Sequence, residues 1–424
     1  MFGRLRLYCV WTALLFLPRL HAQTLEEAWQ VALQNHDGLK AMQASTRAAQ
    51  QQLQAEQAQR LPSLHFGAGY TQFSDSLGAQ TQINQQNFQF NTAQAGTARV
   101  QALASVPLFT SGRIGHNIQA AQASLCASEA GQESQAVTLK LNVAQNYFAV
   151  LRAQGQLDAA QQNLAAHAEH QRVVELRFTQ GLVAKNETLS AALASIEAHQ
   201  QLLHSQNALD IAWAHYNQLL NRPLNERISL QTYTPQLPVG SLETLTDTAL
   251  KQRYELQNLA EQMSALENKA SSVQAELLPQ LALNGGYSYQ ENRYQVNQAL
   301  WQAGVELQWQ LDAQTPHKRA ALNEQVATLT AQRADLAAQI RVQVRAAWLE
   351  SEEMRQRIAL NASGLAQALE NYRLCTERYA QNLLSHSEVL TALSLVSKAR
   401  ADAQAAHYDY ALAVLNLRRA AELL

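Results

Sequence analysis

The chain has 424 residues, a formal net charge of −2 at pH 7 and only 16% charged residues. This balance gives no reason to expect nucleic acid as a partner, because there is no surplus of basic residues to neutralise phosphates. The remaining polarity comes from Gln, Asn, Ser and Thr on a background rich in Ala and Leu. Ala, Leu and Gln are good helix formers, so the composition predicts long helices.

Residues 1–22 have the order of an export signal. Arg4 and Arg6 provide a basic start, residues 8–17 form an apolar run too short to span a membrane, and Ala22 is a small residue before the predicted cut. The alternative interpretation is a buried first helix. The sequence after this segment contains no run of about 18 apolar residues, which predicts that no helix spans a membrane. An exported chain of this kind is periplasmic, secreted or a β-barrel.

The chain contains two similar copies of one sequence pattern. Residues 25–39 match residues 242–256 at an offset of 217, and residues 177–191 match residues 378–392 at an offset of 201. The second offset also aligns two apolar seams with the 4, 3, 4 spacing of a coiled coil, namely Leu209, Trp213, Tyr216 and Leu220 in the first copy and Tyr410, Val414, Leu417 and Ala421 in the second. The offsets differ by 217 − 201 = 16 residues, which the polar stretch 73–96 would accommodate as a loop.

Each copy is predicted to form a helix, two strands, a long helix and a shorter returning helix. The predicted organisation is a signal at 1–22, a first copy at 23–221 with its hairpin at 63–108, a linker at 222–241, and a second copy at 242–424 with its hairpin at 281–311. The predicted helices cover residues 25–59, 113–179 and 185–221 in the first copy, and 317–381 and 386–424 in the second. The predicted fold class is therefore mainly α with a small antiparallel β part.

The predicted strands alternate apolar and polar residues with a period of two. In the first strand, Leu64, Phe66, Ala68 and Tyr70 share one face. Each run is about ten residues long, which is the length of a tilted strand that crosses a bilayer. The polar face would then line water, and its candidate lumen residues are Arg99, Gln101, Gln302, Glu306 and Gln308. The alternative is an amphipathic sheet packed on a soluble core.

Four short strands cannot close a barrel, because closure needs about eight strands or more. Open strand edges are not viable in lipid. If these strands span a membrane, other copies of the chain must therefore complete the barrel, and three subunits with four strands each would provide 4 × 3 = 12. The long, Ala-rich and mostly uncharged helices would similarly form the wall of a hydrated channel.

Short tips join the long helices to the returning helices. Gly181 lies at the first tip and Asn382 at the second, and both residue types tolerate the left-handed conformation found at helix C-termini. We expect Asn186–Glu187 and Ser387–Glu388 to cap the helices that follow and to place negative charge at their starts.

Together these features resemble the TolC family of outer-membrane efflux proteins over essentially the whole mature chain. The motifs that carry the resemblance are the junctions Leu61–Pro62 and Leu278–Pro279, the hairpin exit Pro107–Arg113, and the tip pattern with Tyr379, Asn382, Glu388, Val389, Leu390 and Ala392. The resemblance implies a homotrimer with a 12-stranded barrel in the outer membrane of a Gram-negative bacterium and an α-helical tunnel in the periplasm. It also implies docking to a periplasmic membrane-fusion adaptor and, through it, to an inner-membrane pump of RND, ABC or MFS type.

The resemblance also implies roles for the tips. In that family, acidic residues at the start of the last helix constrict the closed tunnel mouth, and Glu388 occupies the first such position, whereas the second falls on the uncharged Thr391. A ring of three Glu388 carboxylates would favour cations. The alternative is that Glu388 only complements the helix dipole, as Glu187 would in the first copy. The candidates for adaptor docking are Gly181, Leu182, Val183, Asn382, Leu383 and Leu384.

The sequence contains no H-E-x-x-H, G-x-S-x-G or phosphate-loop motif, so we predict no catalytic site, no cofactor and no enzyme activity. His167 and His170 are three residues apart on a predicted helix and could touch one metal ion, but two histidines without further ligands do not make a site. Cys126 and Cys375 are either bridged or two buried thiols. Two rival functions remain open: a soluble periplasmic coiled-coil scaffold or adaptor, and a duct for a secreted protein in type I secretion.

Overall fold

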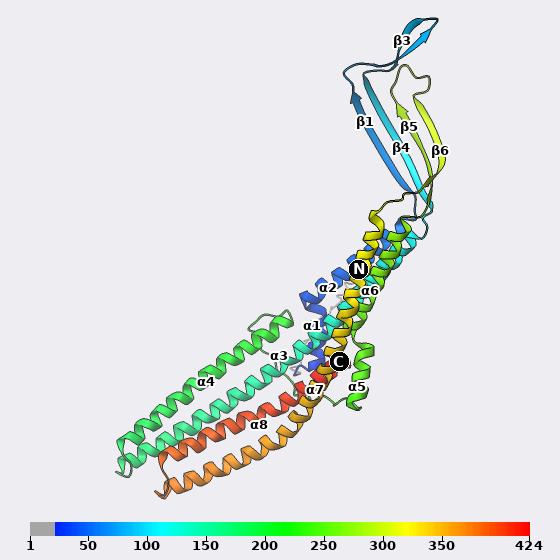
Figure 1. Ribbon diagram of the computed structural model, residues 1–424. Coiled ribbons are helices and arrows are strands. Elements are labelled where there is room, and N and C mark those ends of the chain that lie inside the picture. Colours follow the sequence, from blue (N-terminus) through cyan, green and yellow to red (C-terminus); the bar gives the residue numbers. More distant parts are fainter. Residues whose placement is uncertain (1–21) are drawn as a thin grey trace, which may run out of the picture.

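A computed structural model describes residues 22–424, so the predicted export signal, apart from its last position, lies outside the described residues. The molecule is elongated (Figure 1). A β-sheet lies at one end, helices form the middle, and two helical hairpins reach the opposite end. The sheet and the hairpin tips are therefore the two extremities of the molecule.

The helices between residues 22 and 424 form two sets with equal lengths. The first set comprises α1 (Leu25–Asn35), α2 (Asp37–Ala58), α3 (Arg113–Thr179) and α4 (Lys185–Leu219). The second set comprises α5 (Leu242–Gln252), α6 (Tyr254–Ala275), α7 (Gln314–Ala380) and α8 (His386–Ala420). Helices α3 and α7 have 67 residues each, so each extends about 100 Å. The equal lengths are what a duplicated sequence should produce.

The predicted single helix over residues 25–59 is wrong, because it is interrupted at His36. This residue has a ψ of 121°, an extended conformation that cannot continue a helix, and Arg253 interrupts the second copy in the same way with a ψ of 122°. The interruption lets α1 turn onto α3, where Leu25, Ala28 and Ala32 are completely buried. Tertiary packing therefore sets a boundary that the helical periodicity of the sequence does not show.

The main sheet has four antiparallel strands in the order β1-β4-β5-β6. Its strands are β1 (Ser63–Gln72), β4 (Gly96–Phe109), β5 (Gln280–Gln290) and β6 (Ala299–Gln308). Each copy of the sequence contributes two neighbouring strands, and β4 pairs with β5 at the junction between the copies. Strands β1 and β6 form the two edges, and both edges are open within the described chain.

The stretch predicted as a loop at residues 73–96 instead contains a second hairpin. Strands β2 (Leu77–Ile83) and β3 (Gln86–Ala93) pair with each other beyond the end of the main sheet (Figure 1). Asn84 and Gln85 connect them with φ values of 48° and 64°, and positive φ at both central residues is typical of a tight hairpin turn. The polar composition that suggested a loop is compatible with a hairpin whose two faces are both exposed.

Residues paired across the main sheet point to the same face, and the pairing separates polar from apolar side chains. The apolar face holds Leu64, Phe66, Ala68, Tyr70, Val100, Ala102, Leu281, Leu283, Tyr287, Trp301, Val305 and Leu307. The opposite face holds all five predicted lumen residues together with Ser105, Asn284, Ser288 and Gln290. Phe66 is 70% exposed and Trp301 83% exposed. The predicted alternative, a sheet packed on a soluble core, is therefore wrong, because the chain's described helices do not cover the apolar face.

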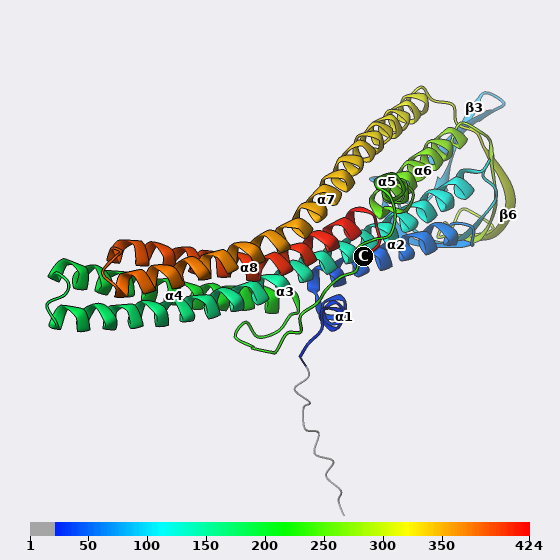
Figure 2. The same cartoon turned by 90° about the horizontal axis from the view of Figure 1, so that it is seen from below.

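The long helices lie side by side in the order α4, α3, α8 and α7 at the end far from the sheet (Figures 1 and 2). The two predicted apolar seams point into this packing. Trp213, Tyr216 and Leu220 are almost completely buried against α3 and α1, and Leu417 and Ala421 are buried against α7 and α5. The seams therefore join each returning helix to its own copy of the long helix.

The segment between the copies, predicted as a linker at 222–241, is fixed to the middle of the molecule. Gln23 forms a parallel bridge with Leu230, and the Tyr147 hydroxyl donates to the Gln23 carbonyl at 2.9 Å and also to the Gln231 carbonyl. Burial raises the pKa of Tyr147 to about 12, so this hydroxyl remains a hydrogen-bond donor. The buried tyrosine thus ties the chain start and the connecting segment to α3.

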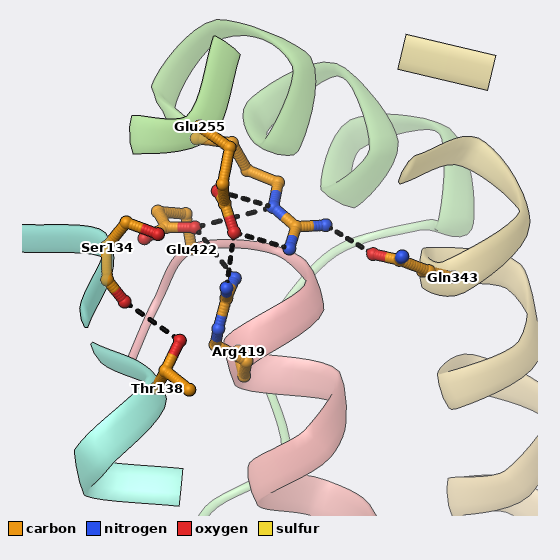
Figure 3. Close-up of polar contacts among 7 residues, drawn as sticks. Ser134, Thr138, Glu255, Gln343, Arg419 and Glu422 are labelled. Carbon is orange, nitrogen blue, oxygen red and sulfur yellow. Dashed lines mark hydrogen bonds and ion pairs between the residues drawn. The ribbon is translucent and has the colours of Figure 1, made fainter. Parts of the chain in front are cut away.

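A buried ionic cluster closes the end of the second copy (Figure 3). The Arg253 guanidinium lies 3.2 Å from the Glu255 carboxylate and 3.6 Å from the Glu422 carboxylate, and it donates to Gln343 on α7 at 2.6 Å. Arg419 on α8 contacts both carboxylates. The four charges cancel, which is how proteins keep ionised groups in a water-poor site. The cluster joins the end of α8 to the start of α6 and to α7.

No helix within residues 22–424 is long and apolar enough to cross a membrane. Cys126 and Cys375 are both free thiols, and each is half-buried. Of the two predicted states for these cysteines, the bridge is therefore excluded, and the thiols are less buried than expected.

Candidate functional site: the hairpin tips and the faces of the sheet

Both tips turn with the same backbone geometry. Gly181 has a φ of 75° and Asn382 a φ of 63°, so both residues are left-handed, as the sequence predicted. The Leu182 amide donates to the Arg177 carbonyl, and the Leu383 amide donates to the Arg378 carbonyl, each at 2.9 Å. The shared geometry places the leucine that follows the left-handed residue at the outer end of each hairpin.

The two tips are tied together by Arg177, a residue of α3 that is only 9% exposed. Its guanidinium lies 4.5 Å from the centre of the Tyr379 ring and donates to the Tyr379 carbonyl at 2.7 Å. It also donates to the side-chain oxygen of Asn382. Asn382 therefore does more than adopt a left-handed backbone, because its side chain receives the arginine of the other hairpin.

A second polar link runs in the opposite direction. The Tyr379 hydroxyl of α7 donates to the Glu187 carboxylate of α4 at 3.3 Å. Burial raises the pKa of Tyr379, and the negative charge of Glu187 adds to this, so the phenol stays protonated. The role predicted for Asn186–Glu187 as a helix cap is wrong, because α4 starts after Ala184 without a side-chain cap and Glu187 binds the tyrosine instead.

The cap of α8 is also displaced from its predicted position. The N-cap is Ser385 and not Ser387, and it forms a reciprocal capping box with Glu388. The Ser385 hydroxyl and amide donate to the Glu388 carboxylate at 2.7 and 3.0 Å, and these bonds lower the pKa of Glu388. Glu388 and Thr391 both lie on the exposed side of α8, one turn apart. This position agrees with either predicted role of Glu388, as a helix-start residue or as part of a constriction.

The tip residues predicted to dock an adaptor fall into two groups. Leu182 and Leu383 are 56% and 70% exposed. Val183 and Leu384 are half-buried and pack on a small apolar cluster of Val174, Ala191, Tyr379 and Val389. Of the six predicted docking residues, only the two leucines and the adjacent Gly181 and Asn382 are therefore exposed in a single chain.

Two histidines meet beside Tyr379 of this cluster. His170 of α3 and His386 of α8 are 5% and 6% exposed, and their rings stack at 4.9 Å with an angle of 8° between the planes. The His170 Nε2 and His386 Nδ1 atoms are 3.0 Å apart and share one hydrogen bond. His167 lies one turn away on α3 and lines one cavity together with Glu197 of α4. Within residues 22–424 no group of three or more potential metal ligands comes together.

The polar face of the sheet carries a transverse ladder of hydrogen bonds. The Ser105 hydroxyl donates to the Asn284 side-chain oxygen at 2.7 Å, and the Asn284 amide group donates to the Glu306 carboxylate at 2.5 Å. Farther along, Arg99 donates to Gln290 at 3.4 Å. The ladder orders the polar side chains across β4, β5 and β6, so this face presents a continuous polar surface.

Sequence reasoning missed Arg177 and the partnership of His170 with His386. Arg177 and Arg378 occupy equivalent positions in the two copies, yet only Arg177 is buried. The duplication therefore identifies Arg177 and Arg378 as equivalent residues, but it does not show which of them contacts a tyrosine of the other hairpin. The histidines are separated by 216 residues, and no local pattern joins them.

Comparison with known proteins agrees with this geometry. Residues 28–222 match the model of the Outer membrane efflux protein family. The cation efflux system protein CusC of Escherichia coli K12 is 25% identical over 264 residues, which are 61% of this chain and 54% of CusC. The outer membrane protein TolC of Vibrio cholerae is 23% identical over 282 residues, which are 64% of this chain and 59% of TolC. The alignments thus span little more than half the length of each relative.

The fold is shared with a solved channel. The CmeC outer membrane channel of Campylobacter jejuni superposes with a TM-score of 0.79 at 17% identity, over 94% of this chain and 85% of that chain. This likeness concerns the fold, and it confirms the predicted class of mainly α structure with a small antiparallel sheet. Family and fold are those of channel proteins and not of enzymes. Residues 28–222 therefore match the Outer membrane efflux protein family, and the chain shares the fold of solved outer-membrane channels.

Proposed function

We propose that this chain is one subunit of a passive outer-membrane duct in a tripartite efflux system. The observation that carries the proposal is the sheet, which exposes a continuous apolar face and has an ordered polar face behind it. Soluble proteins rarely leave large contiguous apolar surfaces uncovered. Lipid against the apolar face and water against the polar face would satisfy both. A soluble periplasmic scaffold would leave the apolar face in water and would not explain the ordered polar face, so this alternative is not favoured.

The duplication supports closure of the wall by further copies of the chain. Helix α3 packs on α6 and on α8. Its counterpart α7 has no comparable packing on α2 and α4 of its own chain within residues 22–424. We infer that α2 and α4 of the next copy occupy those places, and that β6 of one chain pairs with β1 of the next. Three chains with four strands each would close a barrel of 4 × 3 = 12 strands, so the proposed assembly is a homotrimer.

The chemistry of the free helix faces agrees with this interface. Inside the chain, Lys269 of α6 donates to the side chain of Asn117 on α3 at 3.3 Å. Subtracting 217 from 269 and adding 201 to 117 gives the equivalent pair, Gln52 and Lys318, both of which are exposed in the single chain. The pair is again a lysine and an amide, with the two sides exchanged. A hydrogen bond that the chain makes internally could thus be repeated between subunits.

The interface can be tested by cysteine pairing, in a background that lacks the native thiols. Asn258 donates to the Ala127 carbonyl at 2.5 Å, and the equivalent pair between subunits is Ala41 and Thr328. We expect Ala41→Cys with Thr328→Cys to form covalent dimers and trimers on oxidation. The matched pair Asn258→Cys with Ala127→Cys should close only within one chain. Thr330 lies on the opposite side of α7, so Thr330→Cys with Ala41→Cys should not cross-link. Monomers alone from the first pair would refute the ring.

In the proposed assembly, the polar face of the sheet lines the outer opening. Among the five proposed lumen residues one is basic, Arg99, and one is acidic, Glu306, so this face favours neither sign of charge. At the other end, Glu388 and Thr391 would surround the periplasmic mouth, and the tip leucines would meet a periplasmic adaptor joined to an inner-membrane pump. The same duct could pass small solutes or a secreted protein. Purified protein in a planar bilayer should conduct ions, and a sealed bilayer would refute the duct.

A further inference from the structure

The buried histidine pair lies at the contact between the two hairpins of one chain. His170 belongs to the α3–α4 hairpin, and His386 is the first residue of α8 in the α7–α8 hairpin. Arg177, Tyr379 and Asn382 join the same two hairpins about two turns closer to the tips. The pair is therefore one of the links that hold the hairpins together where the proposed duct opens to the periplasm.

The geometry suits two neutral rings and not charged ones. With one proton between them, one of the facing nitrogens donates and the other accepts. Once both rings are protonated, both facing nitrogens carry hydrogens and the stacked rings carry like charges 4.9 Å apart. The other ring nitrogen of His386, Nε2, is buried without a hydrogen-bond partner. No neighbouring acceptor would therefore stabilise a proton on this nitrogen.

The surroundings also disfavour a positive charge. His386 is the first residue of α8, where the helix dipole is positive and repels cations. The apolar cluster of Val174, Ala191 and Val389 lies beside the rings. Burial, followed by the neighbouring His386 and His167, lowers the pKa of His170 to about 4, and burial also lowers the pKa of His386.

The charged groups that face the pair from the packed helices do not compensate. Glu187 of α4 favours protonation of His386, but its carboxylate is bound by the Tyr379 hydroxyl of α7. Arg177 of α3 adds a positive charge over the Tyr379 ring, which itself lies 5.7 Å from the His170 ring. Glu197 of α4 faces His167 and not the pair. The carboxylate that acts on His386 is thus already engaged by Tyr379, and the charge of Arg177 opposes a second positive charge.

We propose that His170 and His386 form an acid-released clamp between the two helical hairpins of each chain. The neutral pair holds α3 against the start of α8, and protonation drives the hairpins apart. The clamp belongs to one chain and does not require the trimer. Its consequence, a wider tunnel mouth at acid pH, rests on the proposed function.

The duplication predicts which helix contacts are weakened by acid. The positions equivalent to His170 and His386 are Asn371 and Lys185, which cannot form a histidine pair. In the proposed trimer these two residues would meet between subunits. Acid would therefore loosen the contacts inside each chain and leave those between neighbouring chains unaffected.

The change in the ratio of separated to clamped hairpins with pH follows from the linkage between proton binding and hairpin separation. The pKa of His170 is lowered in the clamped state, so the separated state binds more protons as the pH falls from 6.5 toward 4. The clamp is thus intact above this window and is lost within it. If the separated ring regains the ordinary value of 6.5, the ratio of separated to clamped hairpins should rise about 30-fold between pH 7.5 and pH 5.

The test is a distance measurement between spin labels at the tips of the full chain. Labels on Leu182→Cys and Leu383→Cys, with Cys126→Ser and Cys375→Ser, report the separation of the two hairpins. Dilution of the labelled chain into an excess of unlabelled chain isolates the distance within one chain, whatever the oligomeric state. We expect one short distance at pH 7.5 and a second, longer population at pH 5.

Two variants separate the clamp from other acid effects. The chain with His170→Asn and His386→Asn should give a distance distribution that does not change with pH. His199→Asn, at an exposed position on α4, should behave as the unmodified chain. An unmodified chain whose distribution does not change with pH, or a double variant that still opens in acid, would overturn the proposal.

The pH midpoint measured on the unmodified chain tests the proposal even if the double variant does not fold. The clamp must open with a midpoint below 6.5, because the pKa of the buried pair is lowered, whereas an exposed histidine would titrate at that value. A midpoint at or above 6.5 would therefore refute it. Bilayer conductance is measured separately. Acid-dependent separation without any conductance would support the clamp and refute the duct.

Discussion

The ionic cluster at the end of α8 supports a quantitative prediction about stability. Replacing Arg253 with methionine keeps the volume similar and removes one of two guanidinium groups from a site with two carboxylates. The Arg253 and Glu422 side chains are only 7% and 5% exposed, so the remaining charges cannot be solvated well. Breaking a buried pair by removing one partner typically costs about 3–5 kcal/mol, and we expect Arg253→Met to lower the free energy of unfolding by that amount.

The two carboxylates of the cluster differ in the direction of their pKa shifts, and this difference identifies a second substitution that should restore stability. Burial raises the pKa of Glu422. Burial also acts to raise the pKa of Glu255, but the hydrogen bond and charge of Arg419 more than offset this, and the pKa is lowered. Glu422 is thus the less well compensated group. Glu422→Gln added to Arg253→Met should restore a neutral cluster and recover at least about half of the loss, because it removes an unpaired buried charge.

The assay is denaturant unfolding of the detergent-solubilised protein, followed by the helical circular dichroism signal. The matched control is Arg355→Met, which breaks an ion pair with Glu352 on the surface of α7, where the side chains are 58% and 38% exposed. Such a pair contributes at most about 1 kcal/mol, so its midpoint should move little. A normal midpoint for Arg253→Met, or a double variant less stable than the single, would show that the charges do not stabilise this site.

Three predictions concern the proposed tunnel mouth and the hairpin tips. Glu388→Gln should weaken block of single channels by cations, and an unchanged block would leave Glu388 as a helix cap only. The bonds from Ser385 lower the pKa of Glu388, so cation block should persist as the pH falls through 4.5 and vanish at a higher pH in Ser385→Ala. Leu182→Asp with Leu383→Asp should abolish drug tolerance in cells without preventing trimer formation, because both side chains are exposed at the tips. Normal tolerance would place adaptor docking elsewhere.

Local patterns in the sequence were sufficient for most of the elements. The alternation of Leu64, Phe66 and Tyr70 with polar neighbours predicted the first strand and its two faces, because side chains in a strand alternate with a period of two. Helix α3 runs over the predicted residues 113–179, since glycines lie at both ends and no proline interrupts it. The left-handed conformations of Gly181 and Asn382 followed from the residue types.

The sequence alone was insufficient wherever a residue's partner lies far along the chain. The break at His36 depends on packing of α1 against α3, and the cap at Ser385 depends on where the tip lets α8 begin. Arg177 and Arg378 are equivalent in sequence, but only the first meets Tyr379 across the two hairpins. His170 and His386 are ordinary helix residues until the fold brings them within 3.0 Å. Periodicity reports the environment averaged over one element, whereas the contact between two particular side chains depends on how whole elements pack.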